Sequence, residues 1–207
     1  MDESVPVPVS TPLSRWLTEL AQPDGDPGGG AASGVMLALA AALLRMVAGY
    51  TTDDPDASEC ARRLVDRRQR ALEAAEADGL SSAELGAALR LSDEDPGRDR
   101  RVRDTAIAAA QSSAVLGEVG AGLVEELRLL AEIGNPQLAA DLAVAAEALA
   151  AGIAGAWINL RFNAQLAQNH EADASDLGSL LGDGRRLDAA RSDAAEIARR
   201  IEDRFQE

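Results

Sequence analysis

DPGGGAASGVMLALAAALLRMVAG, residues 26–49, is the stretch that decides the fold of this chain. Three glycines after a proline predict a tight turn whose backbone has no Cβ to block an approaching group. Residues 31–49 are apolar on every side, which is typical of a helix buried all round. The first N–H groups of such a helix have no partner within it and attract negative charge. Two interpretations remain open: Gly28 to Gly30 present backbone to a ligand, or they only let two helices pack closely.

The rest of the chain predicts helices and no strands, because it lacks hairpin dipeptides and alternating β-branched runs. Gly79 is expected to break one helix, and Gly134-Asn135-Pro136 predicts a helix stop followed directly by a new start. Glycines at 117, 120 and 122 predict a kink or very close helix packing. The expected fold is all-α, with helices at 15–21, 31–49, 57–78, 81–91, 100–133, 137–168 and 186–205.

A length of 207 residues suits one helical domain, expected over 11–207 after a Pro-rich flexible tail at 1–10. Hydrophobic residues make up 46% of the chain but aromatic residues only 2%, so the core must consist of Ala, Leu, Val and Ile. Small side chains bury little area each, and stability must come from long, close helix contacts. A homodimer is therefore expected, in which a second subunit covers part of these helices.

The formal net charge is −15, and all 20 basic residues are arginine. Such a chain should repel nucleic acid and anionic membrane surfaces, which bind through clustered positive charge. Residues 31–49 are barely long enough to span a membrane and contain Arg45, so no membrane span is expected. One cysteine, Cys60, and no visible signal peptide predict a reducing, cytoplasmic location.

Four polar residues interrupt apolar patterns: Asp78, Asp141, Asn159 and Asn163. Asp78 is expected at a helix C-terminus beside Gly79, where the helix dipole would raise its pKa. Asn159 and Asn163 are four residues apart and share a helix face, so they and Asp141 either hold one another or the helix ends, or contact a ligand. One Cys, one His and no HExxH motif give little support to a metal site.

Three segments together resemble the cyclodeaminase/cyclohydrolase family of folate enzymes. The family has a Pro-Gly-Gly-Gly-Ser/Ala loop and an Ala-rich helix ending Met-Val-Ala-Asn, which here reads DPGGGAASG…LLRMVAG. Its Asn-x-x-x-x-Ser-Asp segment corresponds to NPQLAAD, Asn135 to Asp141. Its Gly-Ala-aromatic-x-Asn-Val-x-Ile-Asn segment corresponds to GAWINLRFN, Gly155 to Asn163. The matching order and spacing extend the resemblance over roughly residues 11–168.

This resemblance implies a dimeric, elongated helical bundle that acts on a reduced folate carrying a one-carbon unit, without a further cofactor. The enzyme would be a formiminotetrahydrofolate cyclodeaminase or a methenyltetrahydrofolate cyclohydrolase. By position the family's catalytic acid/base falls on Asp78, and the substrate-binding residues implied are Pro27, Gly28, Gly29, Gly30, Asp141, Asn159 and Asn163. An alternative is a catalytically inactive relative that serves as a helical ligand-binding or scaffolding dimer. The absence of every lysine favours that alternative, whereas the retained Asp78, Asp141, Asn159, Asn163 and glycine loop favour the enzyme.

Overall fold

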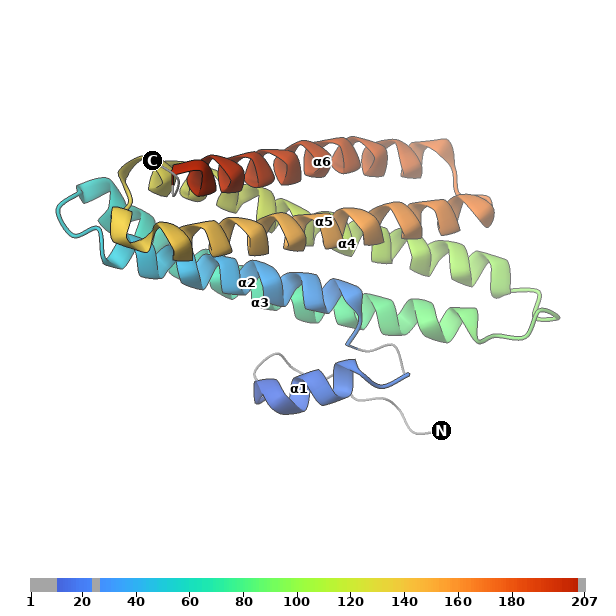
Figure 1. The fold of residues 1–207 in the computed structure, drawn as a ribbon. Coiled ribbons are helices and arrows are strands. Elements are labelled where there is room, and N and C mark those ends of the chain that lie inside the picture. The colour runs from blue at the N-terminus through green and yellow to red at the C-terminus, as the bar shows by residue number, and fades with distance from the viewer. Residues whose placement is uncertain (1–10, 24–26, 205–207) are drawn as a thin grey trace.

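The computed structural model describes residues 11–23 and 27–204, and this part of the chain is helical without strands, as the sequence predicts. The expected tail at 1–10, Asp26 of the glycine loop and the last helix's end at 205 lie outside it. Long helices α2 to α6 lie side by side in an elongated bundle, and short α1 lies apart from them, near α2 and α3 (Figure 1). The elements are α1 Leu13–Leu20, α2 Gly29–Gly49, α3 Pro55–Leu89, α4 Arg98–Ile133, the 3-10 turn Pro136–Leu138, α5 Ala139–Asn169 and α6 Ala174–Asp203.

Helix α2 lies at the centre of the bundle and packs against α3, α4 and α5. Its apolar side chains face several neighbours, and Leu37, Leu44 and Val47 are completely buried. Glycines bring the partner helices close to it. A Cβ on Gly34 would lie 2.5 Å from the Ala75 Cβ of α3, and one on Gly152 of α5 would lie 2.6 Å from Leu37 Cδ2. The expected burial on every side is therefore wrong in part: α2 is buried against α3, α4 and α5, but its outer side is open, where Leu39 is 54% exposed.

Helix α4 is one unbroken helix of 36 residues, and its glycines serve close packing. A Cβ on Gly120 would lie 2.7 Å from Ile153 Cγ1 of α5, and one on Gly117 would overlap Leu187 of α6. Farther along, Glu126 of α4 is buried and accepts hydrogen bonds from Arg63 of α3, Nε to Oε1 at 2.9 Å and Nη2 to Oε2 at 2.8 Å. This paired charge fixes the register between α3 and α4.

The expected break at Gly79 is wrong, because α3 continues through it to Leu89 as one helix of 35 residues. A glycine costs a helix interior up to about 1 kcal/mol, which packing can outweigh. Here Gly79 is itself buried, as are Ala75 before it and Leu85 after it. Asp54 caps the start of the helix by accepting a hydrogen bond from the Asp56 amide at 2.8 Å. Buried contacts on both sides therefore carry the helix across the glycine.

The expected polar loop before the last helix is also wrong, since α6 already begins at Ala174. Leu177 and Leu180 lie three residues apart within this polar segment, and Leu187 follows on the same side of the helix two turns later. Leu180 and Leu187 are 2% and 0% exposed, and Leu177 packs against the core from the rim. The burial of these leucines packs the first turns of α6 against the bundle. This packing stabilises the helix although the residues around the leucines are polar.

By length and composition alone, three helical segments of the described chain could cross a membrane: α2, α4 and residues 136–169. From sequence, only the first of these segments is expected to be long and apolar enough. Of the residues in their most apolar windows, 56%, 50% and 39% respectively are buried inside the bundle. A large share of this apolar surface therefore packs helix against helix, and the rest lies on the outside.

Candidate functional site

Asp78 lies in the interior of α3, and its side chain is only 3% exposed. The carboxylate lies directly against the backbone of Gly30, in the first turn of α2. A Cβ added to Gly30 would overlap Asp78 Oδ2. Glycine at position 30 is therefore what makes room for the Asp78 carboxylate, and the loop and the acid predicted separately from sequence form one site.

Two serine hydroxyls contact the Asp78 carboxylate. Ser113 of α4 is fully buried, and its Oγ lies 3.1 Å from Asp78 Oδ1 and 3.0 Å from the Ala109 carbonyl oxygen. Ser82, one turn farther along α3, also hydrogen-bonds to Asp78. Since a hydroxyl has one proton, Ser113 can donate it to an ionised Asp78, or donate it to Ala109 and accept a proton from a neutral Asp78. The site thus accommodates both protonation states of the carboxyl group.

Burial raises the pKa of Asp78 above its ordinary value of 3.8, and the hydrogen bonds from Ser113 and Ser82 partly offset this. The sequence-based prediction gave the right direction for the wrong reason. Because α3 continues to Leu89, Asp78 is not at a helix C-terminus, and the helix dipole is not the cause. The raised value brings the pKa of Asp78 closer to neutral pH. Near its pKa a carboxyl group can both take up and release a proton.

The start of α2 places next to this acid backbone N–H groups that have no partner within the helix. Gly28 is the N-cap and offers no capping side chain, and the first intrahelical bond there runs from the Ala32 amide to the Gly28 carbonyl at 3.0 Å. The amides of residues 29–31 therefore have no partner within the helix. Pro27, which precedes them, is buried. This end of α2 is suited to an anion or a polarised carbonyl oxygen.

Asn159 of α5 approaches the same end of α2, and Asn163 follows it by one turn along α5. Gly155, one turn before Asn159, is so close to α2 that a Cβ there would overlap Ser33 Oγ. The Asn159 carboxamide lies 3.8 Å from where a Gly29 Cβ would be. Asn163 is 9% exposed, and neither asparagine forms a hydrogen bond with the part of the chain that the structure describes. Both carboxamides are therefore free to bind a ligand beside the Asp78 site.

Asp141 is not brought to this site. It lies in the first turn of α5, 18 residues before Asn159, which corresponds to about 27 Å along the helix. The interpretation that Asp141 and the two asparagines hold one another is therefore wrong. Asp141 instead follows the turn at Asn135, whose amide donates to Thr51 Oγ1 at 3.1 Å, at the other end of the bundle.

Sequence reasoning missed Ser113 and Ser82. Ser82 follows Asp78 by four residues, so its place on the same helix face is a readable pattern once α3 is taken as continuous. Ser113 lies 35 residues from Asp78, inside the Ala-rich run AAAQSSAV. A serine on the apolar side of a buried helix indicates that its hydroxyl has a hydrogen-bond partner. The sequence alone does not identify that partner.

The pKa of Asp78 predicts how stability depends on pH. Because burial raises it, the folded chain keeps this proton at pH values where the unfolded chain has released it, so Asp78 makes the fold less stable as pH rises above 3.8. We expect Asp78→Asn to melt at or above the parental temperature at about pH 7.5, with the difference shrinking towards pH 4. Exposed Asp66 on the same helix provides a control, because Asp66→Asn should shift the melting temperature little at either pH. A marked loss of stability in Asp78→Asn at neutral pH would contradict this account.

Comparisons with known proteins agree with the resemblance found in the sequence. A family-wide sequence profile described as formiminotransferase-cyclodeaminase matches residues 12–176, which include Asp78, the glycine loop and both asparagines. Formimidoyltransferase-cyclodeaminase of Rattus norvegicus is 32% identical over 164 residues, which is 73% of this chain and 30% of that protein. The Mus musculus protein is 32% identical over 168 residues, 75% of this chain and 31% of its own length. The chain thus spans less than a third of either relative.

The fold is also shared with a solved structure. The crystal structure of formiminotetrahydrofolate cyclodeaminase from Thermotoga maritima superposes with a TM-score of 0.79, covering 92% of this chain and 94% of that one at 22% sequence identity. At this identity the likeness shows a common fold. The family itself is shown by the sequence profile, which spans most of the chain. The chain therefore belongs to the formiminotransferase-cyclodeaminase family.

Proposed function

We propose that this chain is a formiminotetrahydrofolate cyclodeaminase, which converts 5-formiminotetrahydrofolate into 5,10-methenyltetrahydrofolate and ammonia. Family membership and the names of the relatives support this reaction. The observation that carries it is the buried Asp78 carboxyl group against Gly30, with hydroxyls on one side and the free amides of α2 nearby. A scaffold protein has no need of a carboxyl group that is buried at a cost and has no cationic partner.

In the proposed reaction, N10 of the folate attacks the amidine carbon carried by N5. A new bond forms between N10 and this carbon, giving a tetrahedral intermediate. The bond from the carbon to the terminal formimino nitrogen then breaks, and that nitrogen leaves as ammonia. Asp78 takes the N10 proton as a carboxylate and returns it to the leaving nitrogen as a carboxylic acid. The raised pKa of Asp78 suits both halves of this cycle, and Ser113 can follow them by redirecting its single proton.

The substrate-binding role is assigned to the groups around the acid. Each asparagine carboxamide has both donors and an acceptor, which is the complement of the amide and amine edges of a pterin ring. Asn159 lies beside Gly29, and Asn163 follows one turn later on the same side of α5. The first backbone N–H groups of α2 provide further hydrogen-bond donors beside these asparagines. Because Gly28 to Gly30 have no side chains, a ligand can approach this backbone closely.

The test is an absorbance assay of purified protein with two substrates side by side. Formation of the methenyl chromophore from 5-formiminotetrahydrofolate, with equal release of ammonia, is the expected result. Consumption of 5,10-methenyltetrahydrofolate alone would instead indicate the cyclohydrolase reaction, in which water adds to the bridging carbon. No turnover of either substrate, together with retained folate binding, would support an inactive relative.

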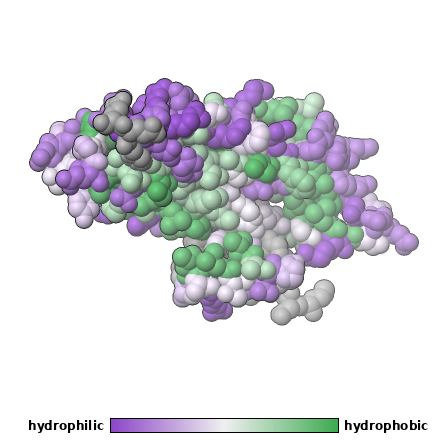
Figure 2. Space-filling view, viewed as in Figure 1, coloured by the Kyte–Doolittle hydropathy of each residue, from purple (hydrophilic) through white to green (hydrophobic). Residues whose placement is uncertain are grey.

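We further propose that the chain forms a homodimer through the outer face of α2 and α5. Large apolar side chains on this face are exposed: Leu39 of α2 at 54%, and Val144, Ile158 and Phe162 of α5 at 59%, 57% and 66%. Apolar residues gather along the face shown in Figure 2, over the same pair of helices. An apolar surface that joins two adjacent helices is typical of an interface between identical subunits.

Leu39→Arg tests this interface. A buried guanidinium without a partner in the middle of an apolar contact is strongly unfavourable, so we expect the dimer to dissociate into folded monomers. Light scattering coupled to gel filtration at micromolar concentration should report twice the chain mass for the parent and the single mass for Leu39→Arg. Leu89→Arg, at the exposed end of α3, is the control and should stay dimeric. A monomeric parent would overturn the proposal.

A further inference from the structure

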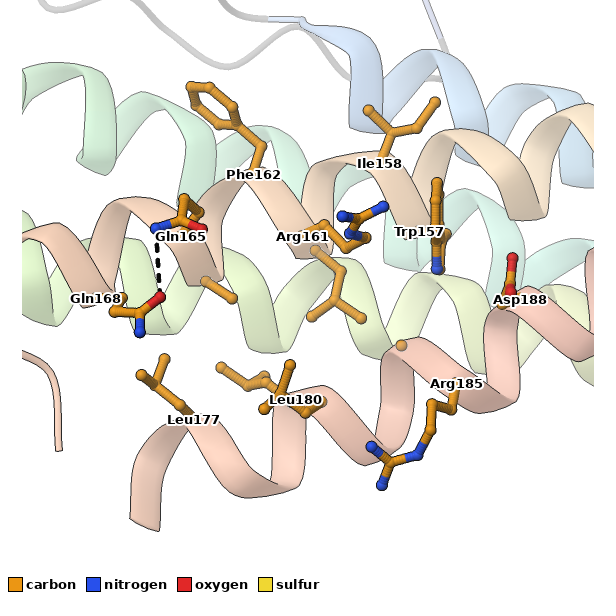
Figure 3. Close-up of a pocket in the computed structure, with 14 residues that line it drawn as sticks. Trp157, Ile158, Arg161, Phe162, Gln165, Gln168, Leu177, Leu180, Arg185 and Asp188 are labelled. Carbon is orange, nitrogen blue, oxygen red and sulfur yellow. Dashed lines mark hydrogen bonds between the residues drawn. The ribbon is translucent and has the colours of Figure 1, made fainter. Parts of the chain in front are cut away.

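A cavity of about 690 Å³ opens between α5 and α6 (Figure 3). Trp157, Arg161, Ala164 and Gln168 of α5 line it, and they recur at helical spacing. Ile158 and Phe162, which belong to the exposed apolar face of α5, also line the cavity, whereas Asp78, Asn159 and Asn163 do not. A volume in this range fits a small organic molecule.

The base of the cavity is apolar and well packed. Leu160 of α5 and Leu180 of α6 are 1% and 2% exposed, and Leu177 stands beside them. Figure 3 shows Leu177 and Leu180 projecting from α6 towards α5. At one end, Gln165 donates a hydrogen bond from Nε2 to Gln168 Oε1 at 3.2 Å. The cavity therefore offers a hydrophobic surface to the body of a ligand and polar groups at its rim.

Positive charge gathers around Trp157. Its ring lies between two guanidinium groups, with the Cζ atoms of Arg161 and Arg191 at 4.6 and 4.7 Å from the ring centroid. Arg191 is neutralised by Asp188, since its Nε lies 2.8 Å from Asp188 Oδ1. By contrast, Arg161 and Arg185, which both line the cavity, form no ion pair with any residue in the described ranges.

Both arginines are exposed, and several other arginines of the described chain also lack an ion pair; what distinguishes Arg161 is its stacking on Trp157 at the edge of an apolar cavity. The one carboxylate that lines the cavity, Asp188, is already paired. Arg161 is held over an aromatic face, so its orientation is fixed in advance and less entropy is lost when it binds an anion. A planar guanidinium held in this way favours carboxylate, phosphate or sulfonate oxygens.

We propose that the cavity between α5 and α6 binds an amphipathic anion. The aromatic or aliphatic body of the ligand packs on Trp157, Leu160 and Leu180, and its anionic group binds Arg161. This site is separate from the proposed folate reaction at Asp78 and does not depend on it. Asp78→Asn should therefore bind such a ligand as the parent does.

The test uses 8-anilinonaphthalene-1-sulfonate as the anionic probe and N-phenyl-1-naphthylamine as its uncharged counterpart, followed by fluorescence. We expect saturable sulfonate binding with quenching of Trp157, and a loss of affinity of roughly 10- to 100-fold in Arg161→Gln, as for loss of a charged hydrogen bond. Affinity for the uncharged probe should change little. Arg199→Gln, an exposed arginine of α6 that does not line the cavity, is the matched control and should bind like the parent.

A second variant distinguishes the cavity from the rest of the exposed apolar face of α2 and α5, which shares Ile158 and Phe162 with the cavity and could also attract an apolar dye. Ala164→Trp places a large ring inside the cavity and should abolish binding of both probes, while circular dichroism remains helical. If Ala164→Trp still binds the sulfonate, the dye occupies the outer face and the proposal is overturned. It is equally overturned if Arg161→Gln binds the sulfonate as tightly as Arg199→Gln, or if the parent shows no saturable binding.

Discussion

Asp78→Asn should lower kcat for 5-formiminotetrahydrofolate by at least about 100-fold, the usual contribution of a positioned acid/base. The carboxamide has the same shape as the carboxyl group and fits against Gly30. It can still accept the Ser113 hydrogen bond, but it cannot take up and return a proton. KM should therefore change little, because the groups assigned to substrate binding are on α2 and α5. The rate of methenyl formation under saturating substrate measures this.

Two further variants refine the result. Ser113→Ala removes the buried hydroxyl but leaves the acid, so we expect a smaller fall in kcat and a shift of the pH profile, since one hydrogen bond that opposes the raised pKa of Asp78 is lost. Asp66→Asn, on the exposed side of the same helix, should react at the parental rate. Parental turnover by Asp78→Asn would remove Asp78 from the reaction and leave the α2 amides and the two asparagines as the remaining groups of the site.

Much of this site could be predicted from sequence because its parts have local signatures. A proline and three glycines before an apolar run mark the start of a buried helix, and a lone acid in an apolar-faced helix marks a candidate group. The spacing of Asn159 and Asn163 places both on one face without any knowledge of the fold. What local patterns cannot give is the pairing between helices. That Asp78 meets Gly30, and not another glycine, depends on how α3 packs against α2.

The errors have the same physical origin. Gly79 and the polar segment 174–185 were predicted as breaks because local propensity is unfavourable there. The structure keeps both in helices, since Leu85 beyond Gly79 and Leu180 and Leu187 of α6 become buried against neighbouring helices. Asp141 was grouped with the asparagines because all three are polar residues on one helix. The 18 residues between Asp141 and Asn159 correspond to about 27 Å along α5, too far for their side chains to meet.

Gly30→Ala is expected to lower kcat/KM by a factor on the order of 100, through displacement of a side chain on another helix. A Cβ at position 30 would occupy the space of Asp78 Oδ2. Because that atom is at the end of a side chain that can rotate, the Asp78 carboxylate should move and the helices should stay in place. Alanine also favours the helix over glycine, so the melting temperature should change little. The measurement is steady-state kinetics together with thermal unfolding.

Gly29→Ala is the matched control, one residue away on the same loop. Its Cβ would meet only the Asn159 carboxamide, at 3.8 and 3.9 Å, which is ordinary contact. We expect it to retain most activity. The double variant Gly30→Ala with Asp78→Asn then decides the mechanism. If Gly30 acts by making room for the catalytic carboxylate, the double variant should be no slower than Asp78→Asn alone, because residues that act as a unit give non-additive losses. A double variant slower by the product of both effects would mean that Gly30 contacts the substrate itself.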